Sequence, residues 1–361
     1  MKFNLSTLRK RGLISILLGI VLIAGGCSTS TFDQKLRAQQ EETYMSWMHE
    51  AKNEAKSSSI DVDADRMMET VLQLVSCNRD TATGKERYRA YLDSAATAMP
   101  GTLSWHDFYM IRPKGDSVAG KNWIYKTGEG NRPIWMITAH YDVVENSPGA
   151  DDNASGVAAM LEIASQLQSV SLDKEVWFVA FDLEEPGLHG SYHFLKSLDL
   201  ETLARIDAVI NLDMIGYINE ADSSQNVPEG FELIFPDLVK SIQSTSSKAD
   251  FAIAAGNFAS RNIMADMVQD LDQAAPELRV GFMLLPNAGK DVQPLRESDH
   301  AHFWDAKLPT VYIGDGADTR NAHYHTANDE PTDVNAAHMA NVTKWLTQVV
   351  AGEGNNQLAD N

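Results

Sequence analysis

The sequence is poor in cysteine and in basic side chains. It contains only two cysteines, Cys27 and Cys77, in 361 residues. With Cys27 in a leader segment, Cys77 has no partner for an internal disulfide, so stability must come from the apolar core and from any bound metal. Lys and Arg number 30 against 50 Asp and Glu, a formal net charge of −20. So acidic a surface argues against nucleic acid or anionic lipid headgroups as partners.

The leading apolar run, Leu13–Ile23, is too short to span a membrane comfortably. It follows four basic residues, Lys2, Arg9, Lys10 and Arg11, and precedes the small residues of Ala24-Gly-Gly-Cys27. A basic region, a short apolar region and small residues in this order are typical of a secretory signal peptide. An ordinary signal peptide, or an anchor helix that happens to contain a cysteine, would share the first two features.

The cysteine after the small residues resembles a bacterial lipoprotein lipobox. The resemblance predicts a signal peptide over residues 1–26, cleavage before Cys27, and acylation of the Cys27 thiol and amine. Several acyl chains would anchor the protein on a membrane of the cell envelope, facing the periplasm or the exterior. Residues 27–60 are polar and predict a tether that runs into a helix, which leaves 61–361 for the folded domain.

From about residue 105 onward, apolar strands alternate with amphipathic helices. The pattern predicts strands at 105–111, 122–126, 134–138, 175–181, 208–212, 279–285 and 310–313, and helices at 61–79, 84–98, 153–169, 187–198, 299–306 and 334–351. This alternation indicates an α/β fold with a mostly parallel or mixed central sheet and helices on both faces. Residues 217–297 are the least readable part, and we expect a helix and loops over the site there.

Acidic and histidine side chains follow three of the predicted strands. His140 and Asp142 come after the strand at 134–138, Glu184 and Glu185 after 175–181, and Asp213 after 208–212. Ligands of α/β sheets gather at the carboxyl ends of the strands, so these side chains are expected to share one edge. Imidazole and carboxylate groups suit zinc, and the sequence therefore indicates a hydrolytic metal site.

The acidic turn Gly149–Gly156 adds Asp151 and Asp152 to this set. The two oxygens of a carboxylate can bridge a pair of metal ions. The turn alone does not rank the two aspartates, and a solvated turn residue is the expectation for Asp151 once Asp152 is taken as the ligand. Asp182 is expected to be a strand-end or capping residue, and Asp299 in Ser298-Asp-His300 a helix cap with a supporting role.

Five motifs in this order resemble the M28 family of zinc aminopeptidases over roughly residues 130–350. They are His140-Tyr-Asp142, Gly149-Ala-Asp-Asp152-Asn-Ala-Ser-Gly156, Glu184-Glu-Pro-Gly-Leu-His-Gly-Ser191, Leu212-Asp-Met214 and Tyr324-His-Thr326. The resemblance implies the zinc exopeptidase fold, like that of phosphorylases and hydrolases, and a late histidine ligand at His325 rather than His323. It also implies a cis peptide bond after the bridging aspartate.

The resemblance further implies two Zn²⁺ ions bridged by Asp152. Four terminal ligands would complete the coordination of the two ions, so that each ion has two of them. His140 and Glu185 would cap one side of the ion pair, and Asp213 and His325 would supply the other two ligands. Which ligand serves which ion is left open. Asp142 would accept a hydrogen bond from His140 and fix its tautomer.

The implied general base is Glu184. It would take a proton from a metal-bridging water and pass it to the leaving amine. A tyrosine that assists the oxyanion in some secreted members is replaced here by Leu295. Tyr217, Tyr324 and Arg296 are the alternatives for that role.

The activity implied is exopeptidase removal of N-terminal residues from peptide substrates. Glutaminyl cyclases share the fold and ligand types but bind one zinc and cyclise N-terminal glutamine; the compact Asp-Asn-Ala-Ser-Gly turn favours the peptidase. A catalytically inactive binding lipoprotein would be expected to have lost Glu184 or a ligand, and none is lost. Carboxypeptidase or amidohydrolase variants stay open, because pocket walls decide which end of a peptide fits.

Overall fold

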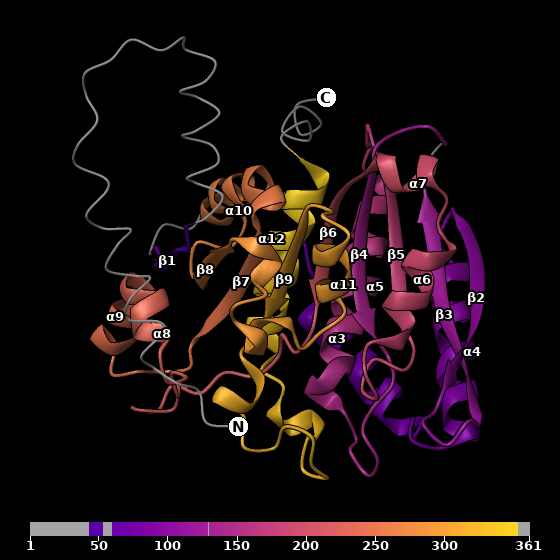
Figure 1. Cartoon of the computed structure of the whole chain (residues 1–361), viewed down its shortest axis with the longest axis horizontal. Coiled ribbons are helices and arrows are strands. Elements are labelled where there is room, and N and C mark those ends of the chain that lie inside the picture. The colour runs from indigo at the N-terminus through magenta and orange to yellow at the C-terminus, as the bar shows by residue number, and fades with distance from the viewer. Residues whose placement is uncertain (1–42, 53–59, 129, 353–361) are drawn as a thin grey trace. The chain divides into compact units, whose positions relative to one another are not determined.

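A nine-stranded sheet runs through the described part of the molecule (Figure 1). The computed structural model describes residues 43–52, 60–128 and 130–352. The strand order is β1-β8-β7-β9-β6-β4-β5-β3-β2. The strands are β1 (Met45–His49), β2 (Thr102–Ile111), β3 (Ser117–Thr127), β4 (Ile134–His140), β5 (Glu175–Phe181), β6 (Ile206–Leu212), β7 (Phe251–Asn257), β8 (Arg279–Leu285) and β9 (Thr310–Gly314).

The centre of the sheet is parallel and its flanks are antiparallel. Strand β4 pairs in parallel with β5 and β6, and β6 with β9. Strands β3, β2 and β1 attach antiparallel, as does β7 to β9, while β7 and β8 are parallel to each other. The predicted α/β fold with a mixed sheet is therefore confirmed. The parallel register sets the carboxyl ends of β4, β5 and β6 side by side.

Helices cover both faces because side chains alternate along each strand. Ile137 and Ala139 of β4 face one apolar layer, whereas Ile134 and Met136 face another. The first layer includes α3 (Ala64–Ser76), α4 (Ala82–Thr97), α5 (Gly156–Gln166), α10 (Arg261–Ala274) and α12 (Ala336–Ala351). The opposite face carries α6 (His189–Ser197), α7 (Leu200–Arg205) and α11 (His300–Asp305), with α8 (Phe231–Ile234) and α9 (Pro236–Ser244) toward β8.

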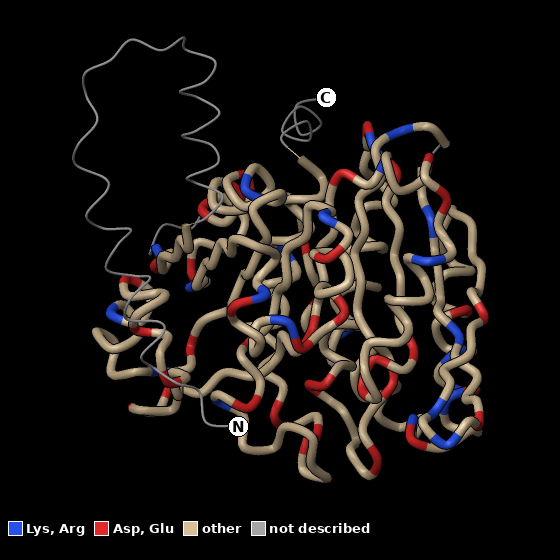
Figure 2. The backbone as a smooth tube through the Cα atoms, in the orientation of Figure 1, with Lys and Arg blue, Asp and Glu red and all other residues tan. Residues whose placement is uncertain are grey.

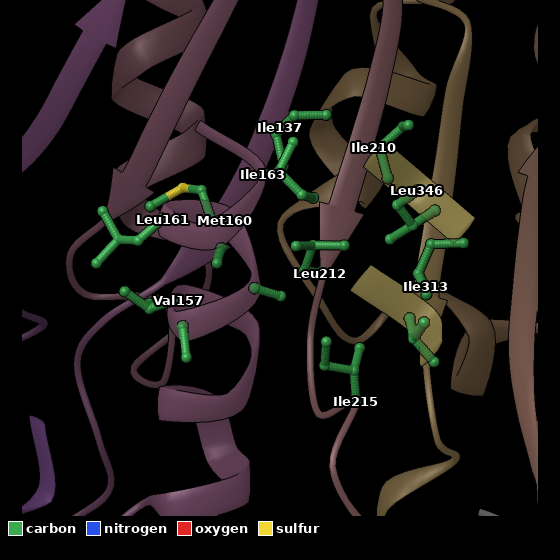
Figure 3. Close-up of a cluster of buried hydrophobic side chains, with 14 of the residues drawn as sticks. Ile137, Val157, Met160, Leu161, Ile163, Ile210, Leu212, Ile215, Ile313 and Leu346 are labelled. Carbon is green, nitrogen blue, oxygen red and sulfur yellow. The ribbon is translucent and has the colours of Figure 1, made fainter. Parts of the chain in front are cut away.

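The core beneath the strand ends is formed where α5 and α12 meet the sheet. Figure 3 shows this cluster, in which the labelled side chains are Ile137, Val157, Met160, Leu161, Ile163, Ile210, Leu212, Ile215, Ile313 and Leu346. Full burial of an aliphatic side chain contributes about 1.5–3 kcal/mol, so this layer holds the ends of β4, β6 and β9 firmly.

Only residues 43–52 and 60 of the segment predicted to be a tether and helix lie within the described ranges, and they include the strand β1. β1 pairs antiparallel with β8, and Trp47 stacks on Phe282 with ring centroids 5.1 Å apart. The free edge of β8 satisfies the backbone groups of β1, which local sequence does not reveal. β1 thus joins the sheet from a position ahead of residue 61, where the sequence predicts the folded domain to begin.

The predicted signal peptide and Cys27 lie outside the described residues. Within the described ranges, the structure contains no helix long and apolar enough to cross a membrane.

The unreadable segment 217–297 is more regular than a helix with loops. It contains two strands of the sheet, β7 and the predicted β8, together with α8, α9 and α10. Its sequence Phe251–Asn257 is rich in Ala and Gly, and these residues carry little strand preference of their own. Burial between β8 and β9 determines the extended conformation of β7.

Candidate metal centre

The predicted ligands converge at the carboxyl ends of the three central parallel strands. His140 is the last residue of β4 and pairs with Phe181 of β5. Glu184 and Glu185 follow β5 within four residues, and Asp213 directly follows β6. Figure 2 shows several acidic positions beside this end of the strands.

The turn Ala150–Ser155 supplies Asp152 just before α5 begins at Gly156. Asp152 departs from helical geometry, with φ −103° and ψ 90°, and the peptide bond from Asp152 to Asn153 is cis, as the resemblance implies. Gly149 opens the turn at φ 67°, where a Cβ atom would lie 2.4 Å from the Asp152 carbonyl oxygen. Only glycine fits this position, and the close turn directs the Asp152 side chain toward the strand ends.

Asp152 lies between two histidines and presents one carboxylate oxygen to each. Its Oδ1 is 3.1 Å from His140 Nε2, and its Oδ2 is 3.1 Å from His325 Nε2. His140 Nε2 also lies 3.4 Å from Asp213 Oδ1, and His325 Nε2 lies 3.1 Å from Glu185 Oε2. The carboxylate therefore belongs to two groups of side chains. Within each group, the ligand atoms lie within 4.8 Å of one another.

The two groups divide the terminal ligands in a way that the resemblance leaves open. One group contains His140, Asp152 and Asp213, and the other Asp152, Glu185 and His325. His140 and Glu185 thus belong to different groups, although a third set of close ligand atoms unites them with Glu184. The parallel pairing explains the division, because β6 ends beside β4 and brings Asp213 toward His140.

The electrostatics of the cluster are dominated by buried carboxylates. Burial lowers the pKa of His140, but Glu184 and Asp213 outweigh it and raise that pKa well above the usual value. Burial likewise opposes the charged form of His325, whereas hydrogen bonds to Asp152 and Glu185 raise its pKa to about 10. Burial raises the pKa of Glu184 well above its usual value, and the neighbouring Asp213 adds to this rise.

A bound cation fits this set of residues. Converging buried carboxylates repel one another unless positive charge lies among them. His140 Nδ1 and Glu185 Oε1 are buried and have no hydrogen-bond partner among the described residues. Two imidazoles and three carboxylates in groups that share one aspartate form a donor set typical of zinc.

Asp142 holds the loop after β5 rather than the His140 ring. Its Oδ1 accepts the Glu184 backbone N–H at 3.0 Å and its Oδ2 accepts the Glu185 N–H at 3.2 Å. The distance from His140 Nδ1 to Asp142 Oδ1 is 3.6 Å, too long for a hydrogen bond. The expected bond from His140 is therefore not formed in this structure, and His140 Nδ1 has no hydrogen-bond partner among the described residues.

Asp151 is a buried residue, which corrects the expectation of a solvated turn position. Its side chain is fully buried, and Oδ1 accepts the backbone N–H of Gly216 at 2.9 Å. Asn321 Nδ2 lies 3.4 Å from the other oxygen. Asp151 therefore connects the turn to the segments after β6 and β9 and faces away from the ligand groups.

Asp182 and His323 have structural partners outside the ligand groups. Asp182 accepts the N–H of Leu183 at 3.0 Å, as expected of a strand-end residue, and forms an ion pair with Arg89 at 2.9 Å. His323 Nδ1 lies 2.6 Å from Asp333 Oδ2, so His325 and not His323 lies in the cluster.

Asp299 does not act as the helix cap that the sequence suggests. It occupies the N-cap position of α11, but its side chain makes no capping hydrogen bond. Both of its carboxylate oxygens are buried without a hydrogen-bond partner in the described part of the chain.

Of the three candidates for the oxyanion, Tyr324 contacts one of the proposed ligands. Its ring stacks on His325 with centroids 3.7 Å apart, and burial beside Asp152 and Asp213 raises the pKa of its hydroxyl. Arg296 is instead engaged by Asp305 at 2.8 Å and by the carbonyl of Ala288.

Sequence reasoning missed the supporting role of Asp329. Its carboxylate accepts the backbone N–H groups of Asp151 and Asp152 at 2.8 Å and 3.1 Å. Its position four residues after His325 was the available signal.

Comparison with known proteins shows the family of the chain. The profile described as Peptidase family M28 matches residues 122–350, more than half of the chain. The uncharacterised protein YfbL of Escherichia coli is 31% identical over 62% of this chain and 68% of its own. Aminopeptidase YwaD of Bacillus subtilis is 46% identical over 26% of this chain. LpqL of Mycobacterium tuberculosis, named a probable lipoprotein aminopeptidase, is 38% identical over 31% of this chain. The last two matches span only 22% and 24% of those relatives.

Solved structures share the fold. The zinc aminopeptidase BSAP from Bacillus subtilis superposes with a TM-score of 0.62 at 16% identity, covering 81% of this chain and 96% of its own. A glutaminyl cyclase from Fimbriiglobus ruber superposes with a TM-score of 0.56 at 18% identity, covering 83% and 99%. The chain belongs to peptidase family M28 and is an enzyme of the metallo-exopeptidase class.

Proposed function

We propose that the protein is a two-zinc aminopeptidase that removes N-terminal residues from peptides. The observation that carries the proposal is the position of Asp152, whose two oxygens face two separate groups of ligands. His140 and Asp213 would hold one Zn²⁺, Glu185 and His325 the other, and Asp152 both. Bound there, the ions would lower the pKa of a water molecule and polarise the scissile carbonyl.

Glu184 is suited to serve as the general base. It is buried at the edge of the ligand groups, and its backbone is fixed by Asp142. Because burial raises the pKa of its carboxyl group, Glu184 can take a proton from the attacking water and give it back to the leaving amine. Neither of the two ligand groups that share Asp152 includes Glu184, although a third close set unites it with His140 and Glu185. In this proposal the Glu184 carboxylate is not a metal ligand and serves for the proton transfer.

Tyr324 is suited to stabilise the oxyanion. Its hydroxyl group is a hydrogen-bond donor, and Asp152, Asp213, Glu185 and Glu184 all raise its pKa, which keeps it protonated. A donor held in place before the reaction stabilises developing negative charge without reorganisation. Tyr324 thus takes the place that Leu295 leaves open.

The second candidate function is cyclisation of N-terminal glutamine. The superposition with a glutaminyl cyclase favours it, since that enzyme shares the fold. Two ligand groups with one histidine each, joined through Asp152, favour the peptidase, because a single metal requires only one of them. We therefore retain the two-zinc peptidase as the proposal.

The membrane location is also a proposal. It depends on the lipobox-like Ala24-Gly-Gly-Cys27 and on the similarity to LpqL. Acylation of Cys27 would hold the enzyme on the cell envelope, where short peptides are its expected substrates.

The test measures zinc content and substrate class together. The purified protein is analysed for bound zinc and assayed on aminoacyl amides, on peptides with a free or acetylated N-terminus, and on peptides that begin with glutamine. We expect two zinc ions, release of N-terminal residues, no cleavage of acetylated peptides, and loss of activity with a chelator. One zinc with cyclised glutamine would replace the proposal by the second candidate. Cleavage of acetylated peptides would exclude an aminopeptidase.

A further inference from the structure

Three consecutive backbone N–H groups before the bridging carboxylate converge on Asp329. The N–H of Ala150 donates to the Asp329 carbonyl oxygen at 3.1 Å. The N–H of Asp151 donates to its Oδ1 at 2.8 Å, and that of Asp152 to its Oδ2 at 3.1 Å. Asp329 is fully buried, so these bonds are shielded from water.

The turn needs acceptors from outside because it lies ahead of α5. The N–H groups of residues 150–152 have no preceding helical turn to donate to, and the backbone of Asp152 and Asn153 is itself not helical. A carboxylate with two oxygens can accept two N–H groups at once. The direction of the Asp152 side chain therefore depends on Asp329.

Asp329 is also fixed to the segment that carries His325. Its N–H donates to the carbonyl of Thr326 at 3.3 Å, and the Thr326 N–H donates to that of His323 at 3.0 Å. His325 Nε2 in turn lies 3.1 Å from Asp152 Oδ2. Asp329 thus connects two segments distant in sequence, each of which carries one proposed ligand.

We propose that Asp329 is a positioning residue that holds Asp152 and His325 in the arrangement that binds metal. The inference rests on the proposed zinc site and deepens it. Residues that orient metal ligands from behind change metal affinity by about 10- to 100-fold when they are replaced. An asparagine keeps one acceptor oxygen and presents an NH₂ group to the second backbone N–H, so one of the two bonds is lost.

The same segment offers a matched control in Asp333. Its carboxylate holds His323, with Oδ2 2.6 Å from Nδ1, and makes no contact with the ligand groups among the described residues. Both Asp329→Asn and Asp333→Asn remove one negative charge within the same stretch of chain. Only the first removes an acceptor from the turn that carries Asp152.

The experiment compares metal binding by the full chain and the two variants. Each protein is stripped with a chelator and titrated with Zn²⁺ against a competing indicator, and its melting temperature is recorded without and with zinc. We expect about 10- to 100-fold weaker zinc binding for Asp329→Asn and a smaller zinc-induced rise in melting temperature. Asp333→Asn should bind zinc as the wild type does. Absorption spectra after Co²⁺ loading should differ from the wild type only for Asp329→Asn.

Two results would overturn the inference. The first is a lower melting temperature of metal-free Asp329→Asn with unchanged zinc affinity, which would make Asp329 a structural residue only. The second is wild-type zinc affinity in Asp329→Glu, a variant that keeps both carboxylate oxygens but moves them by one methylene. Asp329→Glu also serves as the test if Asp329→Asn does not fold. A wild type that binds no zinc would refute the proposed function as well.

Discussion

The backbone N–H of Glu184 donates a hydrogen bond of 3.0 Å to Oδ1 of Asp142. The bond joins the loop after β5 to the loop after β4, so the proposed general base and the proposed ligand His140 share one support. The second oxygen of Asp142 accepts from Glu185, which extends the support to a further ligand.

Replacement of Asp142 should therefore disturb both base and metal. We expect Asp142→Asn to lower zinc affinity and kcat, each by about 10- to 100-fold, because one backbone N–H loses its acceptor. Zinc titration and steady-state kinetics at saturating zinc measure the two effects separately. Weaker zinc binding with an unchanged kcat at saturating zinc would show that Glu184 does not depend on Asp142.

Glu184→Gln should separate catalysis from metal binding. The amide has nearly the same shape but cannot accept a proton from water, so we expect kcat to fall by at least about 100-fold. Bound zinc should stay at two ions, since no proposed ligand is changed. Metal analysis and kinetics on the same preparation test this, and unchanged turnover would refute the mechanism.

Tyr324→Phe tests the proposed oxyanion donor. Loss of one such donor costs about 100- to 1,000-fold in kcat, and we expect KM to change little, because the hydroxyl acts in the transition state. Tyr217→Phe is the matched control; Tyr217 lies after β6, where its hydroxyl accepts from Asn219 at 3.4 Å. Equal effects of the two substitutions would remove Tyr324 from the role.

Burial of His338 predicts a loss of stability in acid. Burial lowers its pKa to about 3, aided by Arg320, and its Nε2 has no hydrogen-bond partner in the described part of the structure. As the pH falls below the unfolded pKa of about 6.5, the unfolded chain binds a proton that the folded chain does not. The free energy of unfolding should then decrease by up to about 1.4 kcal/mol per pH unit toward pH 3.

Urea unfolding of the metal-free protein between pH 4.5 and 6 measures this dependence. The free energy of unfolding of His338→Leu should decrease less steeply with falling pH than that of the wild type. The difference in slope should correspond to the uptake of at most one proton on unfolding. Parallel curves for the two proteins would mean that His338 is protonated in the folded state.

The sequence predicts the central strands well, and it places three of the proposed metal-site residues at their ends. Strands β4, β5 and β6 are largely apolar runs, and their identity depends on residues within the run itself. His140 ends β4, Asp213 directly follows β6, and Glu184 lies three residues after β5, so the rule that ligands collect at strand ends suffices to bring them together. Asp152 and His325 required the resemblance to a known family, since a turn and a distant loop carry no such rule.

Other features depend on contacts between distant residues. β1 and β7 are strands because neighbouring strands accept their backbone hydrogen bonds, and the Ala- and Gly-rich β7 shows no strand preference alone. The division of ligands between the two groups follows from the pairing of β4 with β6.

The turn at residues 149–156 shows the same limit within one motif. Its acidic residues and glycines are visible in the sequence and indicate a metal ligand. Asp151 and Asp152 look equivalent there, yet one is buried against Gly216 and the other faces both histidines. That difference arises from the backbone of the turn and from Asp329, which is 177 residues from Asp152 in the chain. Local chemistry therefore indicates the candidate metal centre, and packing between distant segments assigns each side chain its position.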